Sequence, residues 1–221
     1  TPGEEFRGLG KAIAFPFTYT YGASESTELS LATTYYATPR GGYSPIANNI
    51  IGFKWRFYGD GEDGLAMAIK PTVTLPASTG QQTKGLGLAK TNYEFNFIAS
   101  YFWSSFQIHT NISYARNPYN TNYPISGAYM PYQINIISGS IAPVWAVNSW
   151  LKLAIDIGSS IDTTPQNPSI NDYGMLAAIF SVRKNVDIGI SYLQSGTTLS
   201  NAINGIGDKA NRSEIGVTWR F

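Results

Sequence analysis

The stretch "SEIGVTWRF" at residues 213–221 decides the fold class, because apolar and polar residues alternate along it up to the last position. The apolar positions are Ile215, Val217, Trp219 and Phe221. The positions between them are Glu214, Gly216, Thr218 and Arg220. A period of two indicates a β-strand with one apolar and one polar face. Because the pattern reaches the final residue, we expect the end of the chain to be part of the folded structure.

The same alternation recurs along the whole chain. It is found at 12–21, 27–36, 50–58, 65–76, 92–101, 106–114, 131–143, 151–158, 173–182 and 186–193. Two of these strands are less regular: "NIISGS" breaks the register of 131–143, and both faces of 173–182 are mostly apolar. Short connections such as "GDGED" and "RKN" alternate with long polar ones at 37–48, 77–89, 115–130, 159–171 and 194–211. This predicts an all-β, antiparallel up-and-down meander, with short turns at one end and long loops at the other.

The composition excludes several classes of protein. Charged residues are 13% of the chain, against roughly 25% in ordinary soluble domains, while there are 15 Tyr, 11 Phe and 5 Trp. The net charge of +1 argues against a nucleic-acid partner, which needs a basic surface. The absence of cysteine excludes disulfides and thiolate metal sites. The longest apolar run, "MLAAIF" (175–180), is far too short for a membrane helix.

Alternation alone fits both a membrane barrel and a soluble sheet, whose polar face would meet water. Here the polar positions are mainly Ser, Thr, Asn, Gly and Ala rather than Lys and Glu, and aromatic residues gather near the strand ends. Every Lys, Arg, Asp and Glu of these strands lies on the polar side. A Lys or Arg that faced lipid at mid-depth would cost about 2–4 kcal/mol. We therefore predict a transmembrane β-barrel in the bacterial outer membrane, in contact with outer-membrane lipid.

The C-terminal residues also indicate how the protein reaches its membrane. An alternating apolar strand that ends in Phe resembles the signal read by the bacterial outer-membrane assembly machinery. We expect Val217, Trp219 and Phe221 to form that signal, and the machinery to be a partner during biogenesis.

The strand count predicts one strand more than the eleven visible in the sequence. The last strand should run toward the periplasm, and the strand at 12–21 then runs the same way. Bacterial single-chain barrels have an even number of strands, so we expect a barrel of twelve. The twelfth strand lies upstream of residue 1, or the segment 1–11 passes through the lumen or along the rim, or another chain pairs with the edge. We expect residues 1–221 to form a single domain.

The polar positions give the candidate lumen-lining and binding residues. They are Glu28, Lys54, Arg56, Lys70, Glu94, Asn96, His109, Asn111, Lys152, Asp156, Asp187, Glu214 and Arg220. Because both signs occur, these groups either pair and brace a narrow barrel or line a path for a solute. The single histidine has amide neighbours on its own face, which is typical of a structural group. We therefore expect no catalytic residues, no metal, no cofactor and no enzymatic activity.

Several motifs carry a family resemblance. In order, they are "GFKWRF" (52–57), "AIKPTVTLPASTG" (68–80), "GLGLAK" (85–90), "NYEFNFIASYFW" (92–103), "FQIHTNISY" (106–114) and "GVTWRF" (216–221). They resemble the bacterial outer-membrane channel family named after the meta-pathway of phenol degradation, mainly over residues 50–115 and 173–221. The resemblance implies a twelve-strand barrel, a lumen partly filled by an N-terminal segment, and uptake of small hydrophobic molecules. Matching positions are Gly52, Lys54, Pro71, Leu75, Pro76, Gly80, His109, Asn111, Tyr114 and Asp187. The chain differs at Gln81, where the family often has an acidic residue.

Together these features predict a channel for passive uptake of small hydrophobic or aromatic molecules. Pro71 and Pro76 each lack a backbone N–H, which suggests a lateral opening from the lumen into lipid. Two alternatives are a non-transporting barrel that anchors or encloses a protein partner, and a narrow pore for hydrophilic solutes.

Overall fold

The structure is a computed structural model that describes residues 14–37, 46–82, 90–118, 133–162, 169–199 and 209–220. The described residues contain eleven strands and one short helix. These elements are β1 (Ala14–Ser24), β2 (Thr27–Tyr36), β3 (Ile46–Tyr58), β4 (Gly64–Thr74), α1 (Thr79–Gln82), β5 (Asn92–Phe102), β6 (Phe106–Pro118), β7 (Gln133–Ala146), β8 (Leu151–Asp162), β9 (Ser169–Arg183), β10 (Val186–Leu199) and β11 (Lys209–Trp219). The segment 1–11 and Phe221 lie outside the described residues, so the predictions about them stay predictions.

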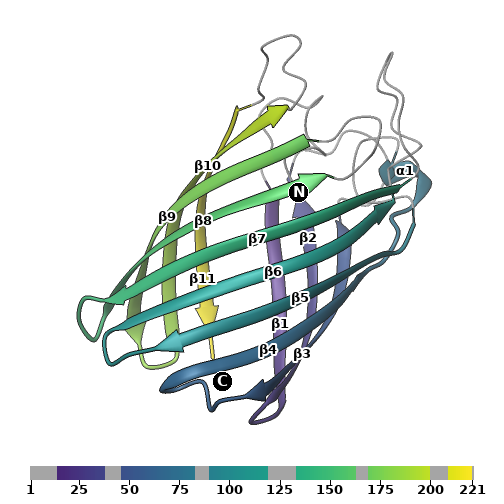
Figure 1. Cartoon of the computed structure of the whole chain (residues 1–221). Coiled ribbons are helices and arrows are strands. Elements are labelled where there is room, and N and C mark those ends of the chain that lie inside the picture. The colour runs from purple at the N-terminus through teal and green to yellow at the C-terminus, as the bar shows by residue number, and fades with distance from the viewer. Residues whose placement is uncertain are drawn as a thin grey trace. The chain divides into compact units, whose positions relative to one another are not determined.

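The strands form one antiparallel sheet in which each strand is hydrogen-bonded to its neighbours in the sequence, from β1 to β11. Within the described residues, short turns follow the odd-numbered strands, as between β5 and β6, β7 and β8, and β9 and β10 (Figure 1). This confirms the predicted up-and-down meander. An odd number of alternating strands also means that β1 and β11 run in the same direction. The twelfth strand stays a prediction.

Contacts between Cα atoms divide the chain into two compact units whose boundaries cut through the middle strands. Unit 1 contains Thr1–Trp55, Ile69–Asn96 and Tyr114–Ile136. Unit 2 contains Arg56–Ala68, Phe97–Ser113 and Ile137–Phe221. The expectation of a single domain stays a prediction, and the two units are described separately below.

Six of the eleven strands, β3, β6 and β8 to β11, extend beyond the segments predicted from alternation at the long-loop end. The ladder of β8 with β9 continues to the pair Asp162 and Ser169, and that of β9 with β10 to Leu199 and Ser169. These extensions carry polar residues because backbone hydrogen bonds hold a ladder together without an apolar face. They also place charged residues on the apolar row, among them Arg116 on β6 and Asp172 on β9, both exposed. The strict separation of charge predicted above therefore holds for the central part of the strands only.

The sheet has an apolar face, which carries the row of Leu29, Phe53 and Ile155, and a polar face, which carries the row of Glu28, Lys54 and Asp156. The large residues of the apolar row are exposed, among them Leu31, Phe53, Ile157 and Leu176. The only described apolar residues that are fully buried are Tyr36, Ala66, Ala68 and Ala115. A soluble domain would bury its Leu, Ile and Phe side chains in a core. A continuous exposed apolar surface instead requires lipid around it.

All five tryptophans lie at the short-turn ends of strands. Trp55 and Trp145 come near the ends of β3 and β7, Trp103 directly follows β5, Trp150 directly precedes β8, and Trp219 ends β11. Each is at least 45% exposed. Trp103 packs beside Tyr101 and Phe106, with ring centroids 4.4 and 5.7 Å apart. Trp and Tyr favour the membrane–water interface because their rings are amphipathic. This row of tryptophans therefore marks one edge of the lipid-facing band.

One strand differs from the prediction. The sequence suggested a break in register at "NIISGS", but β7 runs without interruption from Gln133 to Ala146. Ile137, Ile141 and Trp145 are all exposed on the apolar row. Gly139 keeps its place in this row without a side chain, so the row has a gap while the backbone ladder continues.

Candidate functional site

The polar face of unit 1 contains a cross-strand ion pair. Lys54 on β3 lies opposite Glu28 on β2, and its Nζ is 3.3 Å from Glu28 Oε1. Beside this pair, a Cβ at Gly52 would overlap the Ser30 side chain and touch Lys70 and Thr72. Residue 52 is therefore a glycine because the two neighbouring strands, β2 and β4, bring side chains over it. The pairing favours the bracing role for Glu28 and Lys54.

Three further predicted residues of unit 1 occupy the same face. Lys70 lies on β4, and Glu94 and Asn96 lie on β5. Neither Lys70 nor Glu94 forms an ion pair with any residue that the structure describes. The Oδ1 atom of Asn96 is buried and has no hydrogen-bond partner in the described part of the chain. The structure therefore does not bring these three groups together.

A buried polar cluster at the long-loop end of unit 1 was missed by the sequence analysis. Asn48, which has a positive φ of 56° at an irregularity in the β2–β3 ladder, donates from Nδ2 to the hydroxyl of buried Tyr36 at 2.7 Å. Asn tolerates this left-handed conformation better than most residues. The only signal for this cluster in the sequence was a Tyr on a polar row, with the pair "NN" at residues 48 and 49 further along the chain.

Gln81 of α1 belongs to the same end of unit 1 and is buried. Its Oε1 accepts hydrogen bonds from the backbone N–H and hydroxyl of Ser78 at 2.9 and 3.0 Å, and its Nε2 donates to the carbonyl of Ile46. A carboxylate could accept the first two bonds but could not donate the third. This explains why the chain has an amide where the resembling family often has an acid.

In unit 2, His109 is held from both sides on the polar face. Its Nδ1 is 2.8 Å from Ser100 Oγ, and its Nε2 is 3.3 Å from Gln107 Oε1. The ring of Phe102 meets the imidazole edge-on, with centroids 5.7 Å apart. Both imidazole nitrogens therefore have neutral hydrogen-bond partners, and the structural role of His109 stays a prediction.

A chain of polar groups crosses four strands of unit 2. Asn111 on β6 donates to Ser140 on β7 at 3.3 Å, and Tyr173 on β9 donates to Asp156 Oδ2 on β8 at 3.2 Å. The Tyr173 hydroxyl is also hydrogen-bonded to Ser140, which joins the two pairs. The second carboxylate oxygen, Asp156 Oδ1, is buried and has no partner among the described residues. Asn111 and Asp156, predicted separately, are therefore members of one network.

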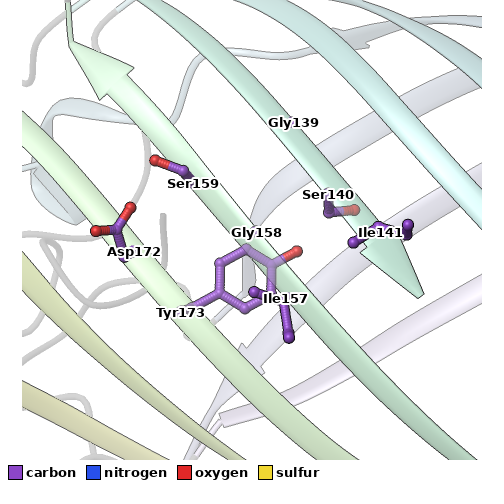
Figure 2. A pocket seen from close by; sticks show the side chains of 8 residues that line it. All are labelled: Gly139, Ser140, Ile141, Ile157, Gly158, Ser159, Asp172 and Tyr173. Carbon is purple, nitrogen blue, oxygen red and sulfur yellow. The ribbon is translucent and has the colours of Figure 1, made fainter. Parts of the chain in front are cut away.

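Tyr173 can occupy its position because the residue opposite it on β8 is a glycine. A Cβ at Gly158, its cross-strand partner, would overlap the Tyr173 ring. Figure 2 shows these residues in a hollow of about 360 Å³ that is also lined by Gly139, Ser140, Ile141, Ile157, Ser159 and Asp172. Most of the lining residues belong to the apolar row, so the hollow opens mainly on the apolar face.

Four further predicted charges of unit 2 are paired or lie beside a partner. Arg220 contacts Asp187, and Lys152 lies close enough to attract the same carboxylate. Glu214 accepts from Arg212 Nε at 2.8 Å and from the Ser191 hydroxyl at 3.4 Å. Arg212 was not among the predicted residues, because the strand was predicted to begin after it.

Arg56 is the member of the predicted set that serves the β3–β4 turn. Its guanidinium lies against Gly61, which has a positive φ of 84°, and its charge acts on Asp60. Asp60 Oδ1 accepts the backbone N–H groups of Glu62 and Asp63 at 2.8 and 3.2 Å. These two hydrogen bonds hold the pKa of Asp60 below its usual range.

Apolar residues interrupt the polar face of unit 2 along β9. Met175, Ala177 and Ile179 alternate with the exposed apolar row and therefore point to the polar side. Met175 lies opposite Leu193 on β10, while Ala177 lies opposite Ala154 on β8. We name Ala154, Met175, Ala177, Ile179 and Leu193 the inner apolar strip. It is the physical basis of the sequence observation that both faces of 173–182 are apolar.

The other predicted features are located as follows. Pro71 lies within β4 and Pro76 two residues beyond its end, with Leu75 N–H bonded to the Asn49 carbonyl at 2.8 Å. The lateral opening stays a prediction. Val217 and Trp219 are each 68% exposed on the apolar row of β11, and their role in assembly stays a prediction.

Within the described ranges, no cluster of His, Cys, Asp and Glu could hold a metal ion, and no helix is long and apolar enough to cross a membrane.

No protein-family model matches the chain, and no curated protein matches it either. The resemblance to the meta-pathway channel family therefore stays a hypothesis. Among solved structures, the chain is similar to outer-membrane expressed OmpT of Vibrio cholerae, with 14% identity, a TM-score of 0.52, and coverage of 92% of this chain and 64% of that one. A loop L8 deletion mutant of OmpT has 13% identity and a TM-score of 0.49, with coverage of 92% of this chain and 62% of that one. An anion-selective porin from Comamonas acidovorans has 12% identity and a TM-score of 0.44, with coverage of 92% of this chain and 57% of that one.

The chain spans less than two thirds of the length of each of these structures. The likeness to outer-membrane OmpT is one of fold, and it confirms the predicted antiparallel up-and-down outer-membrane β-barrel fold. This fold and the exposed apolar face with its row of tryptophans place the chain in the bacterial outer membrane.

Proposed function

We propose that the chain is an outer-membrane channel for the passive uptake of small hydrophobic or aromatic molecules. The inner apolar strip is the observation that carries this proposal. A wall that only had to enclose water would carry Ser, Thr, Asn and charged groups on its inner side. Here Met175, Ile179 and Leu193 interrupt that lining, and they are only partly buried, so a solute can reach them.

The charges of the polar face support the same function. Glu28 pairs with Lys54, Asp187 with Arg220, and Glu214 with Arg212. Ion-selective pores use rings of one sign, because an unpaired field is what attracts one kind of ion. These three pairs combine both signs and form no ring of one sign, which suits neutral solutes.

Intact cells of a Gram-negative host test this proposal, because their lipopolysaccharide layer blocks hydrophobic compounds. We expect cells that express the chain to take up a labelled small aromatic hydrocarbon several-fold faster than cells without it. A matched variant, Ile179→Asp, should reduce the gain, whereas Val182→Thr on the apolar face of the same strand should not.

Two results would replace the proposal by its alternatives. Faster uptake of sugars with unchanged uptake of the aromatic compound would indicate a hydrophilic pore. No flux of either solute, with a protein that co-purifies at fixed stoichiometry, would indicate a non-transporting barrel that holds a partner. The expectation that the chain is not an enzyme stays a prediction.

A further inference from the structure

The inner apolar strip is bordered by ionisable groups in a regular order. The ladders align Asp156 on β8 with Met175 on β9, Met175 with Leu193 on β10, and Leu193 with Arg212 on β11. Neighbouring strands lie about 4.8 Å apart. One row across the polar face therefore consists of a carboxylate, a thioether, a leucine side chain and a guanidinium. Its apolar centre is about as wide as a small aromatic ring.

The two ends of this row differ in what they can still bind. Arg212 Nε is already paired with Glu214 at 2.8 Å. At the other end, Tyr173 occupies only one oxygen of Asp156, and Oδ1 is buried without a donor from the described residues. A buried acceptor that lacks a hydrogen bond costs about 1–3 kcal/mol, more if it is charged. A donor that reached it would therefore be bound strongly.

We propose, building on the function proposed above, that this row is a solute-binding site for small aromatic molecules that carry one hydrogen-bond donor. The apolar body lies on Met175 and Leu193, and its hydroxyl or amino group donates to Asp156 Oδ1. Met175 suits the body because its flexible thioether adapts to shape and packs favourably against aromatic rings. Ser140 and Asn111 hold Tyr173 in place behind the carboxylate, so they act as positioning residues.

The three methionines of the chain provide a direct readout. The full chain, labelled with [methyl-¹³C]methionine and folded in detergent micelles, would be titrated with benzyl alcohol, benzylamine and toluene while methyl resonances are recorded. Met175 should shift and saturate with benzyl alcohol and benzylamine, and at least about tenfold higher toluene should be needed. Met67, on the apolar row of β4, reports partition into the micelle and should shift without saturation. Assignment follows from Met67→Leu and Met130→Leu, which leave Met175 as the remaining resonance.

Substitution of the acid separates the donor contact from the apolar contact. Asp156→Ala should weaken benzyl alcohol binding at least about tenfold and leave toluene unchanged. Asp156→Asn keeps an acceptor of the same shape, so it should retain most binding of benzyl alcohol and lose that of the benzylammonium ion. Glu62→Ala, an exposed acid of the turn between β3 and β4, is the matched control and should change neither.

Equal affinity for the three ligands, or full retention of benzyl alcohol binding in Asp156→Ala, would overturn this inference and leave uptake of hydrophobic molecules standing. A Met175 resonance that never saturates, together with unchanged uptake in cells, would overturn both.

Discussion

The ring of Tyr173 on β9 lies over Gly158 on β8, in the space that a side chain at residue 158 would occupy. This cross-strand pair connects two properties of unit 2. An aromatic ring that covers a glycine fills the wall of the sheet, as in the aromatic rescue of glycine in strands. The same ring brings its hydroxyl within 3.2 Å of Asp156, which borders the inner apolar strip.

The first prediction concerns this close approach. Gly158→Ala should lower the free energy of unfolding by about 1–3 kcal/mol, because the new methyl group displaces the ring. Gly174→Ala is the control, since a Cβ at that position meets no atom within 4 Å. Urea unfolding of the chain in lipid vesicles measures both. In a Tyr173→Ala background the cost of Gly158→Ala should largely disappear, and a cost that persisted would contradict the overlap.

The second prediction concerns the row of tryptophans. In variants that keep one tryptophan and replace the others by Phe, fluorescence should be quenched most by lipids brominated near the headgroup. The reason is that all five residues lie at the short-turn ends of strands. A tryptophan that was quenched best by bromine near the chain ends would lie at mid-depth and contradict this edge of the lipid band.

The third prediction concerns the turn between β3 and β4. Two backbone N–H groups stabilise the Asp60 carboxylate and lower its pKa from the usual 3.8. A lowered pKa in the folded state means that this stabilisation is present above about pH 4 and is lost as the pH falls through the folded value. Asp60→Ala should therefore unfold more easily than the parent chain at pH 7, and this difference should shrink as the pH falls below about 4.

Asp60→Asn serves as the control for that experiment. Its side-chain oxygen still accepts hydrogen bonds but does not titrate over this range, so its difference from Asp60→Ala should stay constant with pH. Equal pH dependence of the parent chain and Asp60→Ala in urea unfolding would show that the carboxylate does not support the turn.

The fourth prediction compares two ion pairs of the polar face. The Asp187 side chain is only 13% exposed and accepts from both Arg220 and Ser181, so Asp187→Asn should cost about 1–3 kcal/mol. Glu28 and Lys54 are 45% and 35% exposed, so Glu28→Gln should cost below about 1 kcal/mol, and less at high salt. Unfolding free energies at two salt concentrations test the order, and the reverse order would contradict the bracing role of Asp187.

The fifth prediction concerns the lateral opening. Replacement of Pro71 and Pro76 by Val restores two backbone donors beside β4. If solutes leave through this region, uptake of a hydrophobic compound by cells should fall several-fold. Pro143→Val, on the apolar row of β7, is the matched control. Unchanged uptake in the double variant would remove the opening from the mechanism and leave the channel itself untouched.

The sequence alone did not predict which side chains pair across neighbouring strands. Glu28 and Lys54 were both predicted on the polar face, but only the β2–β3 register makes them partners. The burial of Gln81 and Tyr36 was not predicted, because both lie beside long segments of sequence that have no periodicity. Arg212 lay outside its predicted strand because the ladder continues where the apolar row stops.

The sequence by itself determined the class of fold, the order of the strands and the face to which most side chains point. Period-two alternation is a local property of each strand. A strand with one face in lipid must keep that face apolar, so its sequence shows the alternation. Only the tertiary structure decided which groups meet across strands: Tyr173 over Gly158, Asp156 beside Met175, and Met175 beside Leu193. Strand register depends on hydrogen bonds between the backbones of neighbouring segments. Every alternating sequence offers the same backbone groups, so the alternation does not reveal the register.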